Sequence, residues 1–244
     1  MITDISTIIW KEARELFLQR PNFRGGWMGL VVMLLVFGVM LPLQSGPEWV
    51  TSPLNLAIWA WVPYLLVSGV VADSIAGERE RHTLETLLAS RLSDQAILFG
   101  KIAASMIYGW GLTMVSVLIS LVTINVAHWE GEPLLFPAGI FLGILGLSFL
   151  VSLMAAGLGV LVSLKAATVR QAQQIFNVVF LLLFIPLFAF PLLPEKLQSQ
   201  VTRWLMNADV TAITLAVSVF LLVLNIVLLA IAMARFRRSR LILD

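Results

Sequence analysis

The chain has 244 residues, of which 59% are hydrophobic and only 12% are charged, and its mean hydropathy is +0.95. These values exclude an ordinary soluble domain and predict a membrane protein that crosses the bilayer several times. The absence of cysteine excludes disulfides, thiolate metal sites and cysteine nucleophiles. The formal charge of +2 does not indicate nucleic-acid binding, because the basic residues stand beside apolar runs.

Residues 1–25 have the pattern of an amphipathic helix that connects to the first span. At 100° per residue, one face is apolar and the opposite face is charged. The apolar positions are Ile2, Ile5, Ile9, Ala13 and Leu16, and the charged positions are Asp4, Lys11, Arg14 and Glu15. Pro21 predicts the end of this helix. We expect it to lie in the cytoplasmic interface of the membrane. It is either a connecting helix with a role in function or an anchor that only sets topology.

Six apolar runs are long enough to cross a bilayer, and none contains an Asp, Glu, Lys or Arg. They cover residues 26–43, 54–72, 102–127, 140–164, 175–193 and 210–234. The fold class we predict is therefore an all-α membrane protein with six transmembrane helices. Residues 1–244 form a single transmembrane domain in this prediction.

The basic residues predict the orientation of these spans. Fourteen of the 16 Lys and Arg residues lie in segments on one face, and only Lys196 and Arg203 lie on the other. Basic residues stay on the cytoplasmic side, so we expect an inner-membrane protein with both termini in the cytoplasm. The external connections are then 44–53, 128–133 and 194–209.

The third external connection differs from the two short turns. Pro186, Pro191 and Pro194 interrupt the end of the fifth run. Apolar residues then recur at helical spacing, at Leu197, Val201, Trp204 and Leu205. The pattern predicts a re-entrant or amphipathic segment at 194–209.

Residues 73–101 form the most charged stretch of the chain and separate the second run from the third. Drawn as one helix over 78–91, the segment has an apolar stripe, with most of its charges off the stripe. The stripe consists of Leu84, Leu87, Leu88 and Leu92, and the charges off it are Glu78, Glu80, Arg81 and Glu85. Ser93 and Asp94 predict the cap of the next helix. Such a helix either docks another protein or is a solvated loop whose charges keep it out of lipid.

The motif in this stretch resembles the membrane subunits of type-2 ABC transporters. The matching residues are Gly77-Glu78-Arg79-Glu80, Thr83-Leu84-Glu85, Leu87-Leu88-Ala89-Ser90 and Gly100-Lys101. The sequence departs from the expected motif at His82, where glycine is common, and at Arg91, where proline is common.

The resemblance implies a cytoplasmic coupling helix that docks on a separate ATP-binding subunit. The partner-binding residues that it implies are Glu78, Arg79, Glu80, Arg81, Thr83 and Glu85. It also implies an exporter that pairs with a second permease subunit, as a homodimer or a heterodimer, with membrane lipid as a further partner. The resemblance implies no nucleic-acid partner.

Missing motifs limit what this chain can do alone. The only Gly-Lys pair, Gly100-Lys101, has Gln95 where a phosphate loop needs its first glycine. We therefore expect no cofactor in this chain, with ATP and magnesium in the partner subunit. Two histidines and no catalytic motif predict no catalytic residue and no metal site.

Two other kinds of protein were weighed against the exporter. A secondary carrier usually needs an ionisable residue inside a span, and the six runs contain none. A membrane scaffold or assembly factor remains open, because residues 73–101 could recruit a cytoplasmic protein without moving any cargo. Asn125, Asn177 and Asn225 are expected to join helices, with Asn177 also a candidate for a translocation path.

Overall fold

The computed structural model describes residues 2–18, 23–129, 131–207 and 209–236, and within these ranges all regular structure is helical. The first half of the chain contains α1 (Ile2–Leu18), α2 (Phe23–Leu35), the π-helix η1 (Val36–Met40), α3 (Leu41–Ser45), α4 (Glu48–Thr51), α5 (Asn55–Val71), α6 (Ala76–Glu80) and α7 (Leu84–Leu88). The second half contains α8 (Asp94–Ala127), α9 (Ala138–Lys165), α10 (Val169–Ala189), the 3-10 helix η2 (Phe190–Leu192), α11 (Glu195–Asn207) and α12 (Val210–Arg235).

Five helical stretches in the described part of the chain are long and apolar enough to cross a membrane. They are Met28–Ser45, Asn55–Glu80, Asp94–Ala127, Ala138–Lys165 and Val210–Arg235. These stretches coincide with the first four and the sixth of the predicted spans. The fifth predicted span, 175–193, coincides with α10 and η2, which are helical but are not among the five. Five of the six predicted spans therefore have structural support, and the fifth, 175–193, stays a prediction.

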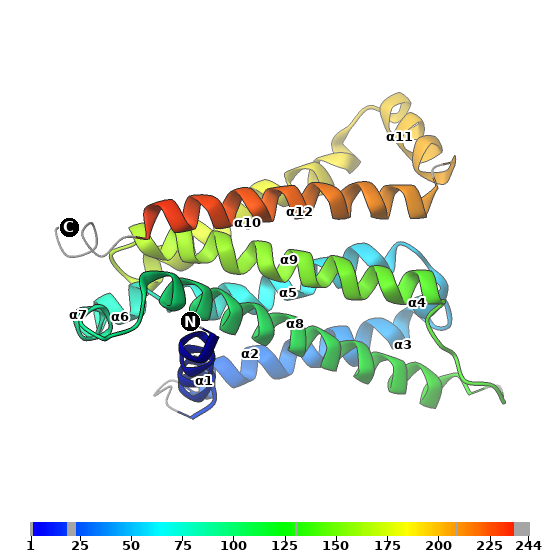
Figure 1. Ribbon diagram of the computed structural model, residues 1–244. Helices are drawn as coiled ribbons and strands as arrows, with labels where there is room; N and C mark the ends of the chain where they lie inside the picture. Colours follow the sequence, from blue (N-terminus) through cyan, green and yellow to red (C-terminus); the bar gives the residue numbers. More distant parts are fainter. Residues whose placement is uncertain (1, 19–22, 130, 208, 237–244) are drawn as a thin grey trace.

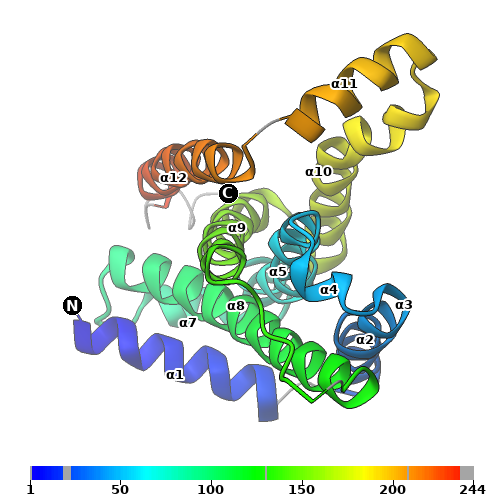
Figure 2. The same ribbon diagram turned by 90° about the vertical axis from the view of Figure 1, so that its right-hand side faces the viewer.

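The helix α9 occupies the centre of the bundle and contacts α5, α8, α10 and α12. Figure 2 shows these four helices around α9. Small residues make the central position possible: Gly159 lies directly against Val71 of α5, and a side chain there would collide with it. Figure 1 shows α1, α6, α7 and the C-terminal end of α12 at one end of the bundle, with α3, α4 and α11 toward the other.

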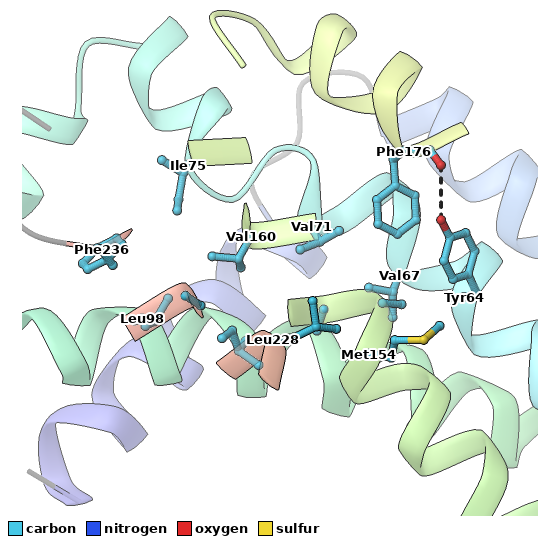
Figure 3. Close-up of a cluster of buried hydrophobic side chains, with 14 of the residues drawn as sticks. Tyr64, Val67, Val71, Ile75, Leu98, Met154, Val160, Phe176, Leu228 and Phe236 are labelled. Carbon is cyan, nitrogen blue, oxygen red and sulfur yellow. Dashed lines mark hydrogen bonds between the residues drawn. The ribbon is translucent and has the colours of Figure 1, made fainter. Parts of the chain in front are cut away.

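A buried apolar cluster joins α5, α9 and α10 near the middle of the molecule (Figure 3). Val67 and Met154 are buried there between α5 and α9. The Tyr64 ring stacks on Phe176 with 4.6 Å between centroids, and the Tyr64 hydroxyl donates to the Phe176 carbonyl at 3.2 Å. A buried hydroxyl with a partner avoids the desolvation cost of an unpaired one. The pair attaches α10 to α5.

The π-helix η1 follows from a proline in the first candidate span. Pro42 has no N–H to donate to the Gly38 carbonyl, which is therefore free to accept from another group. Thr123 of α8 donates its Oγ1 hydrogen to that carbonyl at 2.9 Å. Gly38 has no side chain and so allows this close approach to Ile119. The irregular turn thus packs α2–α3 against α8.

One of the three span asparagines joins two helices, as predicted, and a second joins a helix to a connecting segment. Asn225 of α12 donates to the Leu150 carbonyl of α9 at 3.0 Å. Asn125 of α8 exchanges two hydrogen bonds with the backbone of Leu134. Asn177 instead lies exposed on α10.

One side of α1 packs on protein, a contact that the prediction of an interfacial helix did not include. The most buried residue on that side is Ile8, which was not among the predicted apolar positions, and it packs on α8 with 2% of its surface exposed. Gly100 permits the contact, because a Cβ at that position would lie 2.6 Å from Ile8 Cγ2. The inner face of α1 therefore meets protein.

Some sequence predictions lie outside the described residues. They include the stop at Pro21 and the tail arginines Arg237, Arg238 and Arg240. The segment 194–209 is helical over α11, but the side chains of Val201, Trp204 and Leu205 are not described, so its amphipathic packing stays a prediction.

Candidate functional site

The charged segment after α5 is two short helices, so the single helix predicted over 78–91 is wrong. α6 ends at Glu80 and α7 begins at Leu84. His82 lies between them in the left-handed region with φ 57°. The Thr83 N–H donates to the Glu78 carbonyl at 2.9 Å, and the His82 N–H donates to the Arg79 carbonyl at 3.1 Å. This is a Schellman motif, in which the His82 position usually holds glycine.

A serine of α9 fixes the start of α6. Ser163 Oγ accepts from the backbone N–H groups of Ile75 and Ala76 at 3.1 and 2.8 Å, and it donates to the Ala72 carbonyl at 3.1 Å. The free N–H groups at a helix N-terminus need such acceptors when they are buried. Because the acceptor comes from another helix, α6 cannot move without α9.

A buried ammonium group joins α6 to α1 and α8. Lys101 Nζ donates to Glu12 Oε1 at 2.7 Å, to the Ser74 carbonyl at 2.7 Å and to Glu78 Oε1 at 2.9 Å. The Lys101 side chain is 1% exposed. Three acceptors for three N–H bonds satisfy a buried ammonium completely. We call Lys11, Glu12, Glu78 and Lys101 the charge centre.

The structure places Glu78 inside the chain and not on the proposed docking surface. Glu78 is 2% exposed, and its Oε1 accepts from both Lys101 and Lys11, each at 2.9 Å. A carboxylate buried to this extent needs such partners to stay charged. Glu78 therefore holds α1 and α8 to α6 and does not lie on the exposed surface of the chain.

Lys11 carries a stable positive charge in this arrangement. Burial alone lowers its pKa, but the hydrogen bond to Glu78 and the nearby carboxylates of Glu78, Glu12 and Glu15 outweigh burial and raise the pKa above its usual value. Lys11 also lies 3.4 Å from Glu15 Oε1, one turn along α1. The ammonium is thus charged at neutral pH and pairs with Glu78.

Arg79 and Glu80 connect α6 to the junction between α9 and α10. Arg79 donates to the carbonyls of Ala166 at 2.7 Å and Leu164 at 3.2 Å, at the C-terminal end of α9. Glu80 Oε2 accepts from the Val169 N–H at 3.2 Å, at the first residue of α10. Each charge has the sign that stabilises the helix end it meets. Both residues were predicted to contact a partner, and both contact their own chain.

The remaining predicted partner residues lie on the surface. Arg81 pairs with Asp73 at 3.1 Å and has a 52% exposed side chain. Thr83 is exposed and donates to the Glu78 carbonyl at 3.3 Å. Glu85 is exposed on α7, next to Thr86. The structure therefore leaves Glu80, Arg81, Thr83 and Glu85 exposed, whereas Arg79 is partly buried and Glu78 is buried.

The apolar stripe of α7 faces inward, as predicted for the residues that are described. Leu84 is buried, and Leu87 and Leu92 pack against the same apolar cluster. The side chain of Leu88 is not described. The stripe holds α7 on the bundle and leaves the side with Glu85 outward.

The role of Lys101 was missed by sequence reasoning, which treated it as a topological charge and as part of the Gly100-Lys101 motif. A signal was present: Lys101 directly precedes an apolar run, and ionisable residues at such positions need a partner. Its partners lie 23 and 89 residues away in the sequence, so local periodicity could not identify them.

Comparisons with known proteins match the sequence of the chain to one family. The family model described as ABC-2 type transporter matches residues 3–198. The chain is 27% identical over 166 residues to the ABC transporter permease protein NatB of Bacillus subtilis (strain 168), which covers 63% of this chain and 42% of that protein. The match thus spans less than half the length of this curated relative. No solved structure gives a significant match.

Proposed function

The chain belongs to the ABC-2 type transporter family, and we propose that it is the permease subunit of an ATP-driven exporter. Membership of this family makes the chain a membrane subunit of a transporter. It also implies that an ATP-binding subunit is its partner. In the proposal, that partner is a separate subunit that binds ATP and magnesium, and a second permease, identical or related, completes the transporter. The α10 helix supplies the fifth of the six spans, and both termini lie in the cytoplasm.

The observation that carries this proposal is the way α6 is attached to the bundle. The charge centre joins α6 to α1 and α8, while Arg79 and Glu80 join it to α9 and α10. The outer side of α7, with Glu85 and Thr86, is exposed. A force on that side would reach four helices through hydrogen-bonded groups, which is what coupling ATP hydrolysis to the spans requires.

The outer surface of α10 supports a second subunit or a polar path beside it. Gln173, Gln174 and Asn177 are exposed on α10, at the start of the predicted fifth span. Amide side chains are unfavourable against lipid tails and pair with other helices or water. In the proposal, the first, second and fifth spans form the walls of the path.

A single charge reversal tests the docking assignment. Glu85→Lys should lower the amount of ATP-binding subunit that co-purifies with the tagged chain by about tenfold, because it replaces an attraction with a repulsion at the interface. It should lower transport-coupled ATP hydrolysis in parallel. Glu85 is preferred to Glu80, because Glu80 already accepts from the backbone of α10.

Glu132→Lys is the matched control, since Glu132 is also exposed but lies in the predicted external connection. It should leave association and hydrolysis unchanged. If Glu85→Lys retains both at the level of the unaltered chain, α7 is not the coupling surface. If an ATP-binding subunit associates but its rate of ATP hydrolysis is the same with and without the chain, a membrane scaffold explains the chain better than an exporter does.

A further inference from the structure

A pocket of about 610 Å³ lies between α1 and the α6–α7 segment, beside the charge centre. Its volume is in the range of small-molecule sites in proteins. Its charged lining consists of Lys11, Glu12, Glu15, Asp73, Glu78 and Arg81. Leu16, Val70 and Leu87 add apolar surface. The pocket therefore has a mixed lining of charged and apolar groups.

Two buried polar atoms of this lining have no hydrogen-bond partner in the described part of the chain. They are Glu78 Oε2 and Ser74 Oγ, in residues that are 2% and 5% exposed. A buried polar atom without a partner costs about 1–3 kcal/mol, and more when it belongs to a charged group. Neither atom is needed by the charge centre, which uses Glu78 Oε1 and the Ser74 carbonyl. Both atoms therefore have unused hydrogen-bonding capacity.

The charges around the pocket leave one negative charge in excess. The carboxylates of Glu12, Glu15, Asp73 and Glu78 face three basic groups, those of Lys11, Arg81 and Lys101. Glu78 Oε2 has no basic partner, because both basic neighbours of Glu78 bind its other oxygen. A cation placed there would balance the charge.

We propose that this pocket binds one alkylammonium or alkylguanidinium group. The cationic head donates to Glu78 Oε2 and Ser74 Oγ, and the alkyl stem packs against Leu16, Val70 and Leu87. The described residues contain no group of three or more His, Cys, Asp or Glu that could hold a metal ion. An organic cation fits better, because it supplies both directed donors and an apolar stem.

The group has two possible sources, a free small cation or a Lys or Arg side chain of the ATP-binding subunit. The second source rests on the proposed function. It is compatible with the position of α7, which forms one wall of the pocket and carries Glu85 on its outer side. In that case the partner would insert a basic side chain between α1 and α7.

Agmatine, a small alkylguanidinium, is the probe for the pocket itself. We expect it to raise the melting temperature of the purified full chain in detergent, at constant ionic strength, whereas neutral 1,4-butanediol does not. The Ser74→Ala variant should need about tenfold more agmatine to reach half of the maximal rise in melting temperature. The reason is that it loses one hydrogen bond to the charged head group. Its melting temperature without agmatine should not fall, because the removed hydroxyl has no partner.

Ser68→Ala is the matched control, because Ser68 Oγ already donates to the Leu65 carbonyl at 2.7 Å and does not line the pocket. It should respond to agmatine as the unaltered chain does. No effect of agmatine on the unaltered chain, or an equal effect on Ser74→Ala, would overturn the proposal.

Co-purification of the ATP-binding subunit in the presence of agmatine then separates the sources. A loss of the subunit assigns the pocket to its basic side chain, and an unchanged amount assigns it to a free cation. If no ATP-binding subunit associates under any condition, the proposed function fails, while the thermal measurement still decides whether the pocket binds the cation.

Discussion

Lys101 is the residue on which the cytoplasmic-end architecture depends most. Its ammonium group binds two carboxylates and one carbonyl, from α1, α6 and the turn before α6. A buried ion pair adds little net stability over an apolar replacement, but removal of one partner leaves the other charge buried without compensation. The role of Lys101 is therefore to fix how three segments meet.

Lys101→Met should lower the free energy of unfolding by about 3–5 kcal/mol, because Glu78 and Glu12 lose a buried partner. Unfolding of the purified chain by denaturing detergent, followed by circular dichroism, measures the change. Lys165→Met, at an exposed position at the end of α9, should change stability by less than about 0.5 kcal/mol.

The double variant Lys101→Met with Glu78→Leu should recover part of the loss, since it removes the uncompensated charge as well. If Lys101→Met is as stable as Lys165→Met, the charge centre does not hold these helices together.

His82 occupies a backbone conformation that favours glycine. Its φ of 57° is disfavoured for a residue with a Cβ by roughly 1–2 kcal/mol, whereas glycine adopts it without steric cost. His82→Gly should raise the free energy of unfolding by up to about 1 kcal/mol, with the entropy of glycine offsetting part of the gain. The same unfolding assay measures it.

Thr83→Gly is the comparison for this substitution. Thr83 has φ −99°, where glycine gains nothing, and the variant should be less stable than the unaltered chain. A loss of stability in His82→Gly comparable to that in Thr83→Gly would contradict the assignment of His82 to the turn.

Sequence reasoning identified the right segment for the site but not the roles of its residues. The motif around Glu78 drew attention to the α6–α7 region, and the outward position of Glu85 agrees with the expected docking surface. The contacts of Glu78, Arg79 and Glu80 within the chain are with residues 67 to 89 positions away in the sequence or, for Glu78, also with Lys101 of α8. Helical periodicity shows which neighbouring residues share a face of one helix, and it gives no information about contacts between distant segments.

At the level of helices, the contact between α1 and α8 decides whether α1 is part of the bundle. Gly100 of α8 lies against Ile8, and a side chain at this position would displace α1. Gly111 lies on the same helix in open space, with nothing within 4 Å of a Cβ there. The two glycines therefore form a matched pair.

Gly100→Val should loosen α1 and leave the rest of the bundle intact. We expect amide hydrogen exchange in residues 2–18 to become faster by about tenfold or more, because overpacking of this kind costs about 1–3 kcal/mol. Gly111→Val should exchange as the unaltered chain does. Equal exchange of α1 in the two variants would show that the Ile8 contact does not hold α1.

Helix positions were predictable where polarity changes sharply and less so elsewhere. The predicted run 54–72 and the observed α5 agree closely, because Ser52-Pro53 precedes the run and Asp73 follows it. The helix α8 begins at Asp94, eight residues before the predicted run, because Ser93 caps it and the helix includes Lys101, which bordered the predicted run. The break at His82 was missed, because an apolar stripe does not report backbone φ.

At the scale of the whole molecule, the end that holds α1, α6 and α7 is proposed to face the cytoplasm (Figure 1). The charge count supports this orientation, since 14 of 16 Lys and Arg residues fall on that side in a six-span arrangement. The arrangement needs α10 to cross the membrane. Both the docking surface and the pocket depend on this orientation.

Labelling of single cysteines with a membrane-impermeant thiol reagent tests the orientation and the span count together, and the cysteine-free chain makes the signal clean. Thr168→Cys and Glu85→Cys, on the proposed cytoplasmic side, should react only after the membrane is opened. Glu132→Cys and Lys196→Cys should react in intact cells. Reaction of residue 85 from outside, or protection of residue 196 together with residue 168, would contradict the six-span permease with a cytoplasmic coupling surface.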